Sequence, residues 1–233
     1  MQIKDSVVIV TGANRGLGQN FVQALLAGGA RKVYAAARRP ESIVMSGAIP
    51  IQLDVTNAAD IRRVASELAD VTLLINNAGI ALGSNILDAD SAEKTKAELE
   101  VNLFGPLAMS QAFAPTLAKN GGGAIVNILS ILSWLNIPGW ATYSISKAAT
   151  WSMTNGLRNE LRQQNTQVVG VHIAYMDTDM TKGVTAPKAD PKDVVRQTLE
   201  AIVANKDEVF ADALTAQVRQ GLSNSVYLGA PGA

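Results

Sequence analysis

A serine, a tyrosine and a lysine in one short stretch carry the side chains needed to move a proton. Tyr143 and Lys147 are i and i+4, so in a helix they lie on one face. A phenol has a reference pKa of about 10 and needs a nearby cation to stabilise its phenolate at neutral pH. Lys147 can supply this cation. The hydroxyl of Ser130, directly after the apolar run 124–129, can hold a carbonyl or carbinol oxygen beside the phenol. These residues predict proton transfer to an alcohol oxygen.

A glycine-rich turn near the N-terminus adds a second kind of site. The apolar run Val7–Val10 leads into Thr11-Gly12-Ala13-Asn14-Arg15-Gly16-Leu17-Gly18, and a helical pattern follows as far as Gly28-Gly29. Such a turn lets backbone N–H groups approach a pyrophosphate at the positive end of a helix dipole. Glycines that only make a tight turn, and a Tyr-x-x-x-Lys spacing that arises by chance, are the alternatives. The combination favours a dinucleotide-dependent enzyme.

In order and spacing, these motifs resemble the single-domain branch of the short-chain dehydrogenase/reductase family. The resemblance runs from about Ser6 to Met180 and includes Asn76-Asn77-Ala78-Gly79, which matches the family's Asn-Asn-Ala-Gly. It implies reversible reduction of a carbonyl group, in which a nicotinamide cofactor delivers hydride and Tyr143 donates the proton. It further implies that Ser130 orients the oxygen and that Lys147 lowers the tyrosine pKa and binds the nicotinamide ribose.

Asn102 is the fourth expected catalytic residue. A helical pattern from about Ser91 to Lys119 is interrupted at Gly105-Pro106 and again at Pro115. A proline clashes with the carbonyl four residues earlier, so Pro106 should free the Asn102 carbonyl. In the family, an Asn here binds a water that links the lysine to a proton relay. Alternatively, the kink only shapes the helix around the core.

The cofactor contacts are expected at the glycine turn, at the ends of neighbouring strands and on the catalytic helix. The family resemblance places Asp54 and Val55 against the adenine, although Asp54 is equally suited to cap a helix near Thr56-Asn57. It also gives Thr178 a bond to the nicotinamide carboxamide, but Ile173-Ala174 replaces the usual Pro-Gly before it. The expected cofactor-binding residues are Gly12, Asn14, Arg15, Gly16, Leu17, Gly18, Arg38, Asp54, Val55, Asn76, Ala78, Gly79, Tyr143, Lys147 and Thr178.

Arg38 predicts a preference for NADP(H), with NAD(H) still possible. In dinucleotide-binding folds an acidic residue at the end of the second strand binds the ribose 2′-OH and repels a 2′-phosphate. Here that position is Ala37, followed by Arg38. The fork of Arg38 suits a phosphate, and Arg15 can approach the same group. The alternative is that Arg38 and Arg39 are only solvated residues at the end of a strand.

Alternating strand and helix patterns predict an α/β fold: a single-domain, Rossmann-type, doubly wound parallel sheet with helices on both faces. Residues 1–233 are expected to form one dinucleotide-binding and catalytic domain, with a mobile substrate flap near 175–190. The predicted strands are residues 7–10, 33–37, 49–53, 73–75, 124–129, 168–173 and 208–210.

Composition excludes several other classes of protein. The 20 basic and 20 acidic residues form no basic cluster, which argues against a nucleic-acid or anionic-membrane partner. Without cysteine and with His172 as the only histidine, a zinc site is not expected. His172, within an apolar strand, is interpreted as structural. No signal core or run of about 18 apolar residues occurs, so a cytoplasmic protein is expected.

The expected function is NADP(H)-dependent reduction of an apolar or aromatic ketone or aldehyde by a homo-oligomer, a tetramer or else a dimer. The family pairs its subunits through the helices expected at 91–119 and 142–164. The alternatives are a non-catalytic nucleotide-binding regulator with the same fold and a dehydratase or epimerase, which the short C-terminal region disfavours. The expected pocket walls, of which the two tryptophans also suit the core or a subunit contact, are Ile131, Leu132, Trp134, Leu135, Ile137, Trp140, Tyr175 and Val184.

Overall fold

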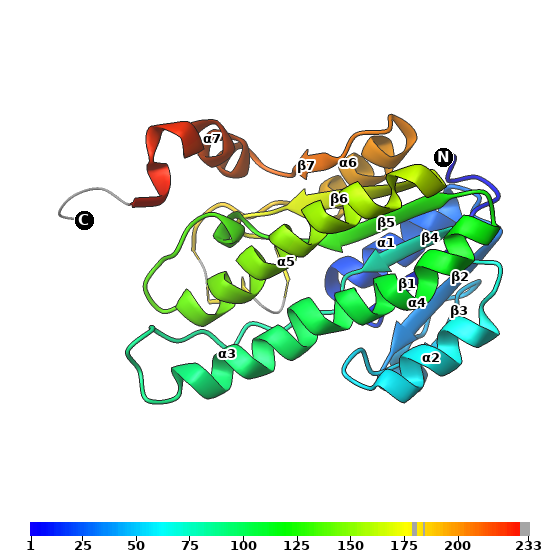
Figure 1. The fold of residues 1–233 in the computed structure, drawn as a ribbon, viewed down its shortest axis with the longest axis horizontal. Helices are drawn as coiled ribbons and strands as arrows, with labels where there is room; N and C mark the ends of the chain where they lie inside the picture. The colour runs from blue at the N-terminus through cyan, green and yellow to red at the C-terminus, as the bar shows by residue number, and fades with distance from the viewer. Residues whose placement is uncertain (179–180, 184, 229–233) are drawn as a thin grey trace.

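One parallel sheet runs through the protein. The computed structural model describes residues 1–178, 181–183 and 185–228. Within these residues, seven strands pair in the order β3-β2-β1-β4-β5-β6-β7, all in parallel (Figure 1). The strands are β1 Val7–Thr11, β2 Lys32–Ala37, β3 Ile49–Gln52, β4 Leu73–Asn76, β5 Gly123–Ile128, β6 Thr166–His172 and β7 Glu208–Phe210. The predicted fold class and all seven predicted strands are confirmed.

Alternate residues of the central strands face two separate apolar cores. On one face Val8 and Val10 pack with residues of α1 and α6. On the other face Val7 and Ile9 pack with residues of α2, α4 and α5, which lie in front of the sheet in Figure 1. Burial on both faces explains why the strands read as continuous apolar runs. The helices are α1 Gly16–Ala27, α2 Ala58–Glu67, α3 Ser91–Leu99, α4 Gly105–Lys119, α5 Ala141–Leu161, α6 Pro191–Val203 and α7 Ala213–Gly221.

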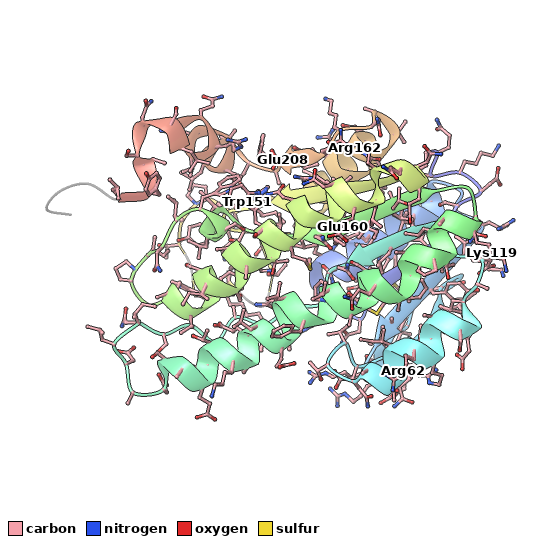
Figure 2. The ribbon with its side chains drawn as sticks, viewed as in Figure 1. Arg62, Lys119, Trp151, Glu160, Arg162 and Glu208 are labelled. Atoms are coloured by element: carbon pink, nitrogen blue, oxygen red, sulfur yellow. The ribbon has the colours of Figure 1, made fainter. Side chains whose placement is uncertain are left out.

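The outer faces of the helices carry charge. Figure 2 shows Arg62 on α2, Lys119 on α4 and Glu160 on α5 pointing away from the sheet, and all three are exposed. This division between a buried apolar stripe and a charged face is the one expected of helices that cover a sheet. None of the helices in the described part of the chain has both the length and the apolar character needed to cross a membrane.

The helical stretch between β4 and β5 departs from the prediction. α3 passes into a π-helical turn at Glu100–Phe104, and α4 then starts at Gly105. The interruption near Gly105-Pro106 is confirmed, but it takes the form of a wide π-helical turn that ends at Phe104, two residues before the proline. Pro115 lies inside α4 without ending it, so the second predicted interruption is wrong.

The strand order reverses between β1 and β4, which are neighbours in the sheet. From β1 the sheet continues through β2 to β3, and from β4 it continues in the opposite direction through β5. Ligands of doubly wound sheets bind outside the carboxyl ends of the strands at such a point. The fold therefore directs attention to the segments that follow β1, β4, β5 and β6.

Candidate active site

A cavity of 190 Å³ lies at the carboxyl ends of the central strands. Every motif that follows a central strand contributes to its wall. The lining residues are Arg15, Gly16, Leu17, Asn77, Gly79, Ile80, Ile128, Leu129, Ser130, Tyr143, Lys147, Ile173, Ala174, Met176, Thr178 and Thr181. The structure thus brings together Ser130, Tyr143 and Lys147 with five further residues of the expected cofactor site.

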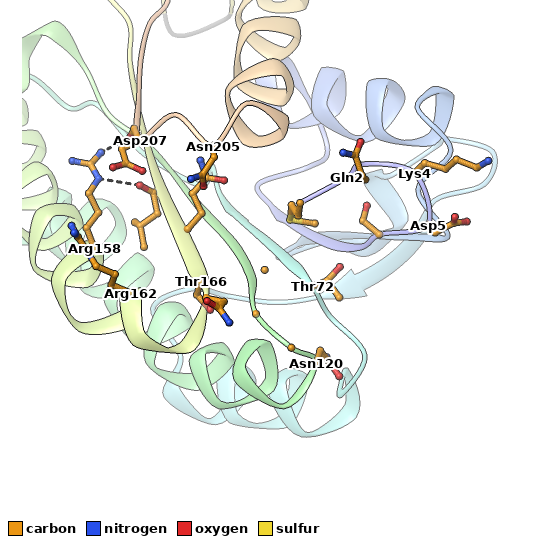
Figure 3. A pocket seen from close by; sticks show the side chains of 18 residues that line it. Gln2, Lys4, Asp5, Thr72, Asn120, Arg158, Arg162, Thr166, Asn205 and Asp207 are labelled. Carbon is orange, nitrogen blue, oxygen red and sulfur yellow. Dashed lines mark hydrogen bonds between the residues drawn. The ribbon is translucent and has the colours of Figure 1, made fainter.

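A larger and more open hollow of 830 Å³ lies at the opposite, amino-terminal ends of the strands (Figure 3). It is lined by residues that precede strands, among them Thr72 and Asn120. The guanidinium of Arg158 donates to the carbonyls of Val168 and Asp207, at 3.0 and 2.6 Å. It therefore binds backbone groups in the wall of this hollow. The smaller cavity, with its tyrosine and lysine, is therefore the candidate active site.

The predicted catalytic residues Ser130, Tyr143 and Lys147 are held by the end of β5 and the first turns of α5. Ser130 follows β5 and caps a short 3₁₀ turn, accepting from the N–H of Leu132 at 3.1 Å. Tyr143 and Lys147 lie in α5, and the lysine Nζ is 5.6 Å from the centre of the tyrosine ring. This amine also donates to the carbonyl of Ile128 at 2.8 Å. The i, i+4 geometry predicted from the sequence is confirmed.

Burial dominates the ionisation of both groups. It raises the pKa of Tyr143 well above its ordinary value, the negative charge of Glu98 adds to this rise, and a hydrogen bond with Ser130 opposes it. Burial also lowers the pKa of Lys147 to about 8. A buried amine that still carries its proton near neutrality can favour the phenolate through its charge, but it loses this capacity as the pH rises through about 8.

We therefore expect kcat/KM for NADPH to fall as the pH rises through about 8, because this ratio reports ionisations of the free enzyme. The phenol of Tyr143 keeps its proton over the same range. The Lys147→Arg variant, whose guanidinium stays charged to above about pH 12, should lose the fall even if its activity is low. A flat wild-type profile from about pH 7 to about pH 9 would contradict the assignment to Lys147.

Asn102 is buried, and its carbonyl accepts a hydrogen bond, so the prediction of a free carbonyl is wrong. The Thr150 hydroxyl donates to this carbonyl at 2.8 Å, across from α5. The Asn102 amide group is also engaged: its oxygen accepts from the N–H of Ile80, and its nitrogen donates to the Ile80 carbonyl and to the Ser146 hydroxyl, each at 2.9 Å. The π-turn and Pro106 remove the helical donor, but a hydroxyl replaces it. A carbonyl has two lone pairs, so a role in a water relay stays a prediction.

The glycine turn is shaped to bring backbone close to a ligand. Gly12 and Gly16 have φ of 64° and 54°, values that favour glycine. A Cβ at Gly18 would collide with the Gly12 carbonyl oxygen. Arg15 is the residue that precedes α1, and its side chain does not cap the first N–H groups of this helix. A turn with this geometry at the start of a helix fits the pyrophosphate of a dinucleotide.

Two neighbouring asparagines divide the structural work behind the turn. Asn76 is buried and donates to the side-chain oxygen of Asn127 at 2.9 Å, joining β4 to β5. Asn77 donates to the carbonyls of Thr11 and Gly12, at 2.9 and 3.1 Å, and it lines the cavity. The structure places Asn77 at the cavity wall and Asn76 behind it. Two consecutive asparagines in the sequence do not indicate which of them lines the cavity.

The residues expected around the adenosine end of the cofactor do not line the cavity. Arg38 and Asp54 follow the neighbouring strands β2 and β3, and the charge of Arg38 is a minor cause of the lowered pKa of Asp54. The main cause is the hydrogen bond from the Thr56 N–H. Asn57, not Asp54, caps α2, so the alternative role for Asp54 as a helix cap is wrong. Val55 packs close to Gly105.

The segment after β6 follows a defined path without the Pro-Gly pair. The N–H of Ala174 donates to the carboxylate of Asp212 at 2.9 Å, and Met176 pairs with Ala189 in a short parallel bridge. The side chain of Thr178 lies near Gly16: its Cγ2 is 3.5 Å from the position that a Cβ on Gly16 would take. The bridge closes the base of the predicted flap. Residues 179, 180 and 184, including the predicted pocket residue Val184, lie outside the described residues.

Tyr143 packs against an apolar cluster. Most of the pocket residues predicted from the sequence belong to it, and the ring of Trp140 meets that of Tyr143 edge-on at 6.2 Å. Trp134 instead stacks on the buried ring of His172 at 4.1 Å. Sequence reasoning missed Val218, because the fold alone brings α7 to this place. The members of the cluster are Ile131, Leu132, Val218, Trp134, Leu135, Ile137, Trp140, Tyr143 and Ala174.

The comparisons with known proteins agree with this site. The family model for short chain dehydrogenases matches residues 6–189. Dehydrogenase/reductase SDR family member 7B of Danio rerio is 30% identical over 258 residues, covering 97% of this chain and 81% of the relative. The NADP-dependent 3-hydroxy acid dehydrogenase of Schizosaccharomyces pombe is 26% identical, covering 97% and 98%.

A solved structure is more similar still. A short chain dehydrogenase from Burkholderia cenocepacia J2315, in complex with NADP, superposes with a TM-score of 0.93 at 42% identity, covering 99% of this chain and 100% of that one. The doubly wound fold and its Ser, Tyr and Lys therefore define a nucleotide-dependent oxidoreductase. The chain belongs to the short-chain dehydrogenase/reductase family.

Proposed function

We propose that the protein is an NADP(H)-dependent carbonyl reductase that acts on apolar or aromatic ketones or aldehydes. The observation that carries this proposal is the meeting of Ser130, Tyr143 and Lys147 on one cavity, with an apolar cluster around the tyrosine. The NADP in the Burkholderia cenocepacia structure and in the name of the Schizosaccharomyces pombe relative supports the choice of cofactor.

The residues divide the work of the reaction. The glycine turn at Gly12–Gly18 would hold the pyrophosphate, and Thr178, which lies near Gly16, would hold the nicotinamide end. When bound, the cofactor supplies the hydride. Ser130 orients the carbonyl oxygen by a hydrogen bond, and Tyr143 gives that oxygen its proton. Lys147, anchored on the Ile128 carbonyl, favours the phenolate that is left behind.

The direct test is oxidation of NADPH by the purified protein across a panel of carbonyl compounds. We expect turnover with apolar and aromatic members and little with small charged ones, since the side chains that pack with Tyr143 in the described cluster are apolar or aromatic. A protein that binds NADPH but oxidises it with none of the panel would favour a nucleotide-binding regulator.

We also propose a homo-oligomer, a tetramer or else a dimer, paired through α4 and α5 (Figure 1). Met109 and Phe113 of α4 are fully buried in the core and are not available for an interface. Exposed apolar side chains are present on these helices and on the π-turn next to them, namely Phe104 and Ile145, which are 48% and 37% exposed. Such residues often mark an interface.

Light scattering at micromolar concentration should therefore show a mass that is a multiple of the 24.5 kDa chain. Phe104→Glu should shift the distribution toward the monomer by placing a charge in the interface. Leu87→Glu is the matched control, since Leu87 is 97% exposed and lies in the loop before α3. A wild-type protein that is only monomeric would refute the proposal.

A further inference from the structure

We propose that Glu98 is a positioning residue for Tyr143, because its buried carboxylate anchors a loop that caps the start of α5. This inference rests on the proposed function, since it assigns Glu98 a role relative to the proton donor. Glu98 does not line the cavity, so it acts through the backbone and is not a catalytic residue.

The carboxylate of Glu98 holds the chain between β4 and α3. Glu98 is fully buried in α3, a rare position for a glutamate unless it is paired. Its Oε1 accepts from the N–H of Leu82 at 2.7 Å and from the N–H of Gly83 at 3.3 Å. Hydrogen bonds to an ionised acceptor are the stronger kind. The two N–H groups would otherwise have to find other acceptors, and the 82–84 loop would lose its anchor.

The same loop completes the N-terminus of the catalytic helix. The first N–H groups of a helix have no partner within it, and no side chain of the residue before α5 caps them. The carbonyl of Ser84 accepts instead from the N–H of Ala141 at 2.9 Å and from that of Thr142 at 3.4 Å. Tyr143 is the next residue. A short chain of bonds therefore runs from Glu98 through the 82–84 loop to the tyrosine.

Close packing and a second tie fix the loop in register. Gly83 has a φ of 65°, and a Cβ there would lie 2.8 Å from the carbonyl oxygen of Gly139, just before α5. Lys94, one turn before Glu98 on α3, donates to the Gly83 carbonyl at 3.0 Å and pairs with Asp90 at 2.8 Å. The loop is thus held on its N–H side by Glu98 and on its carbonyl side by Lys94.

Glu98 also acts on Tyr143 through its charge. In the described part of the chain, the charged groups close to the tyrosine are Lys147, one turn along α5, and Glu98 in α3. After burial, the charge of Glu98 is the second cause of the raised tyrosine pKa. A merely structural residue would not have this effect, so the anchor and the charge can be separated by substitution.

The first experiment needs no substrate. We expect Glu98→Ala to speed hydrogen exchange at the Ala141 and Thr142 amides, because the loop that caps them is released. Glu98→Asp keeps the charge but is shorter by one methylene group, and it should have the same effect in a protein closer to wild type. Glu93→Ala, at an exposed site on the same helix, should leave exchange unchanged. Wild-type exchange in both Glu98→Ala and Glu98→Asp would overturn the proposal.

The second experiment uses turnover. Glu98→Gln keeps an accepting oxygen of the same reach and removes the charge, so α5 should stay protected while the tyrosine ionisation in alcohol oxidation moves to lower pH. Glu98→Ala should reduce kcat by about 10- to 100-fold, the scale of a small misplacement of a catalytic group, with KM for NADPH little changed. An unshifted profile for Glu98→Gln together with wild-type kcat for Glu98→Ala would count against positioning. A wild-type protein without turnover would refute the proposed function, and the exchange experiment would still decide on the anchor.

Discussion

The Tyr143→Phe substitution should reduce kcat by about 10²–10⁴-fold or more, the contribution of a positioned proton donor. Phenylalanine keeps the ring that meets Trp140 edge-on and packs in the apolar cluster, so only the hydroxyl is lost. Affinity for NADPH, measured by fluorescence titration, should change little.

Tyr34→Phe is the matched control. It also removes one tyrosine hydroxyl. Tyr34 lies in β2 and does not line the cavity, and its hydroxyl donates to Asp70 at 3.4 Å. Its kcat should match that of the wild type. A Tyr143→Phe enzyme that kept near-wild-type kcat would eliminate Tyr143 as the proton donor and with it the proposed mechanism.

NADPH should have a lower KM than NADH, and Arg38→Asp should remove most of this advantage. Arg38 is exposed at the end of β2, next to Asp54, where a ribose 2′-phosphate would lie in this fold. A hydrogen bond to a charged group contributes about 1.5–3 kcal/mol, which corresponds to a rise of about 10- to 100-fold in KM for NADPH. The KM for NADH should change less, since it has no phosphate to repel.

Arg39→Asp provides the comparison at the neighbouring position. It changes the net charge by the same amount, but Arg39 is one residue further from the strand and should matter less. Steady-state kinetics with both cofactors decide the matter. Equal KM values for NADPH and NADH in the unmutated protein would already refute the preference, without any variant.

Features that depend on neighbours in sequence could be predicted. The glycine turn follows its strand directly, and Tyr143 and Lys147 share a helix face by spacing alone, so periodicity was enough to place them. Ser130 directly follows an apolar run, so its place after a strand could also be predicted, and the end of β5 brings it to the same cavity.

Features that depend on contacts across the fold could not be predicted. The Asn102 carbonyl was expected to be free because the proline argument considers one helix, whereas its partner Thr150 belongs to another. Glu98 looked like one of several charged residues on a polar helix, and only the packing of α3 against the loop shows that it is buried. Val218 joins the cluster around Tyr143 for the same reason.

The bridge between Met176 and Ala189 bears on how the substrate selectivity of the protein could be altered. Because this pairing closes the segment at its base, the chain between the two residues can vary in length without moving β6 or α6. The entropic cost of a longer closed loop rises only slowly with its length. We therefore expect loop exchange between Lys182 and Lys188 to change substrate selectivity while Thr178 and the glycine turn, the proposed cofactor contacts, stay unchanged.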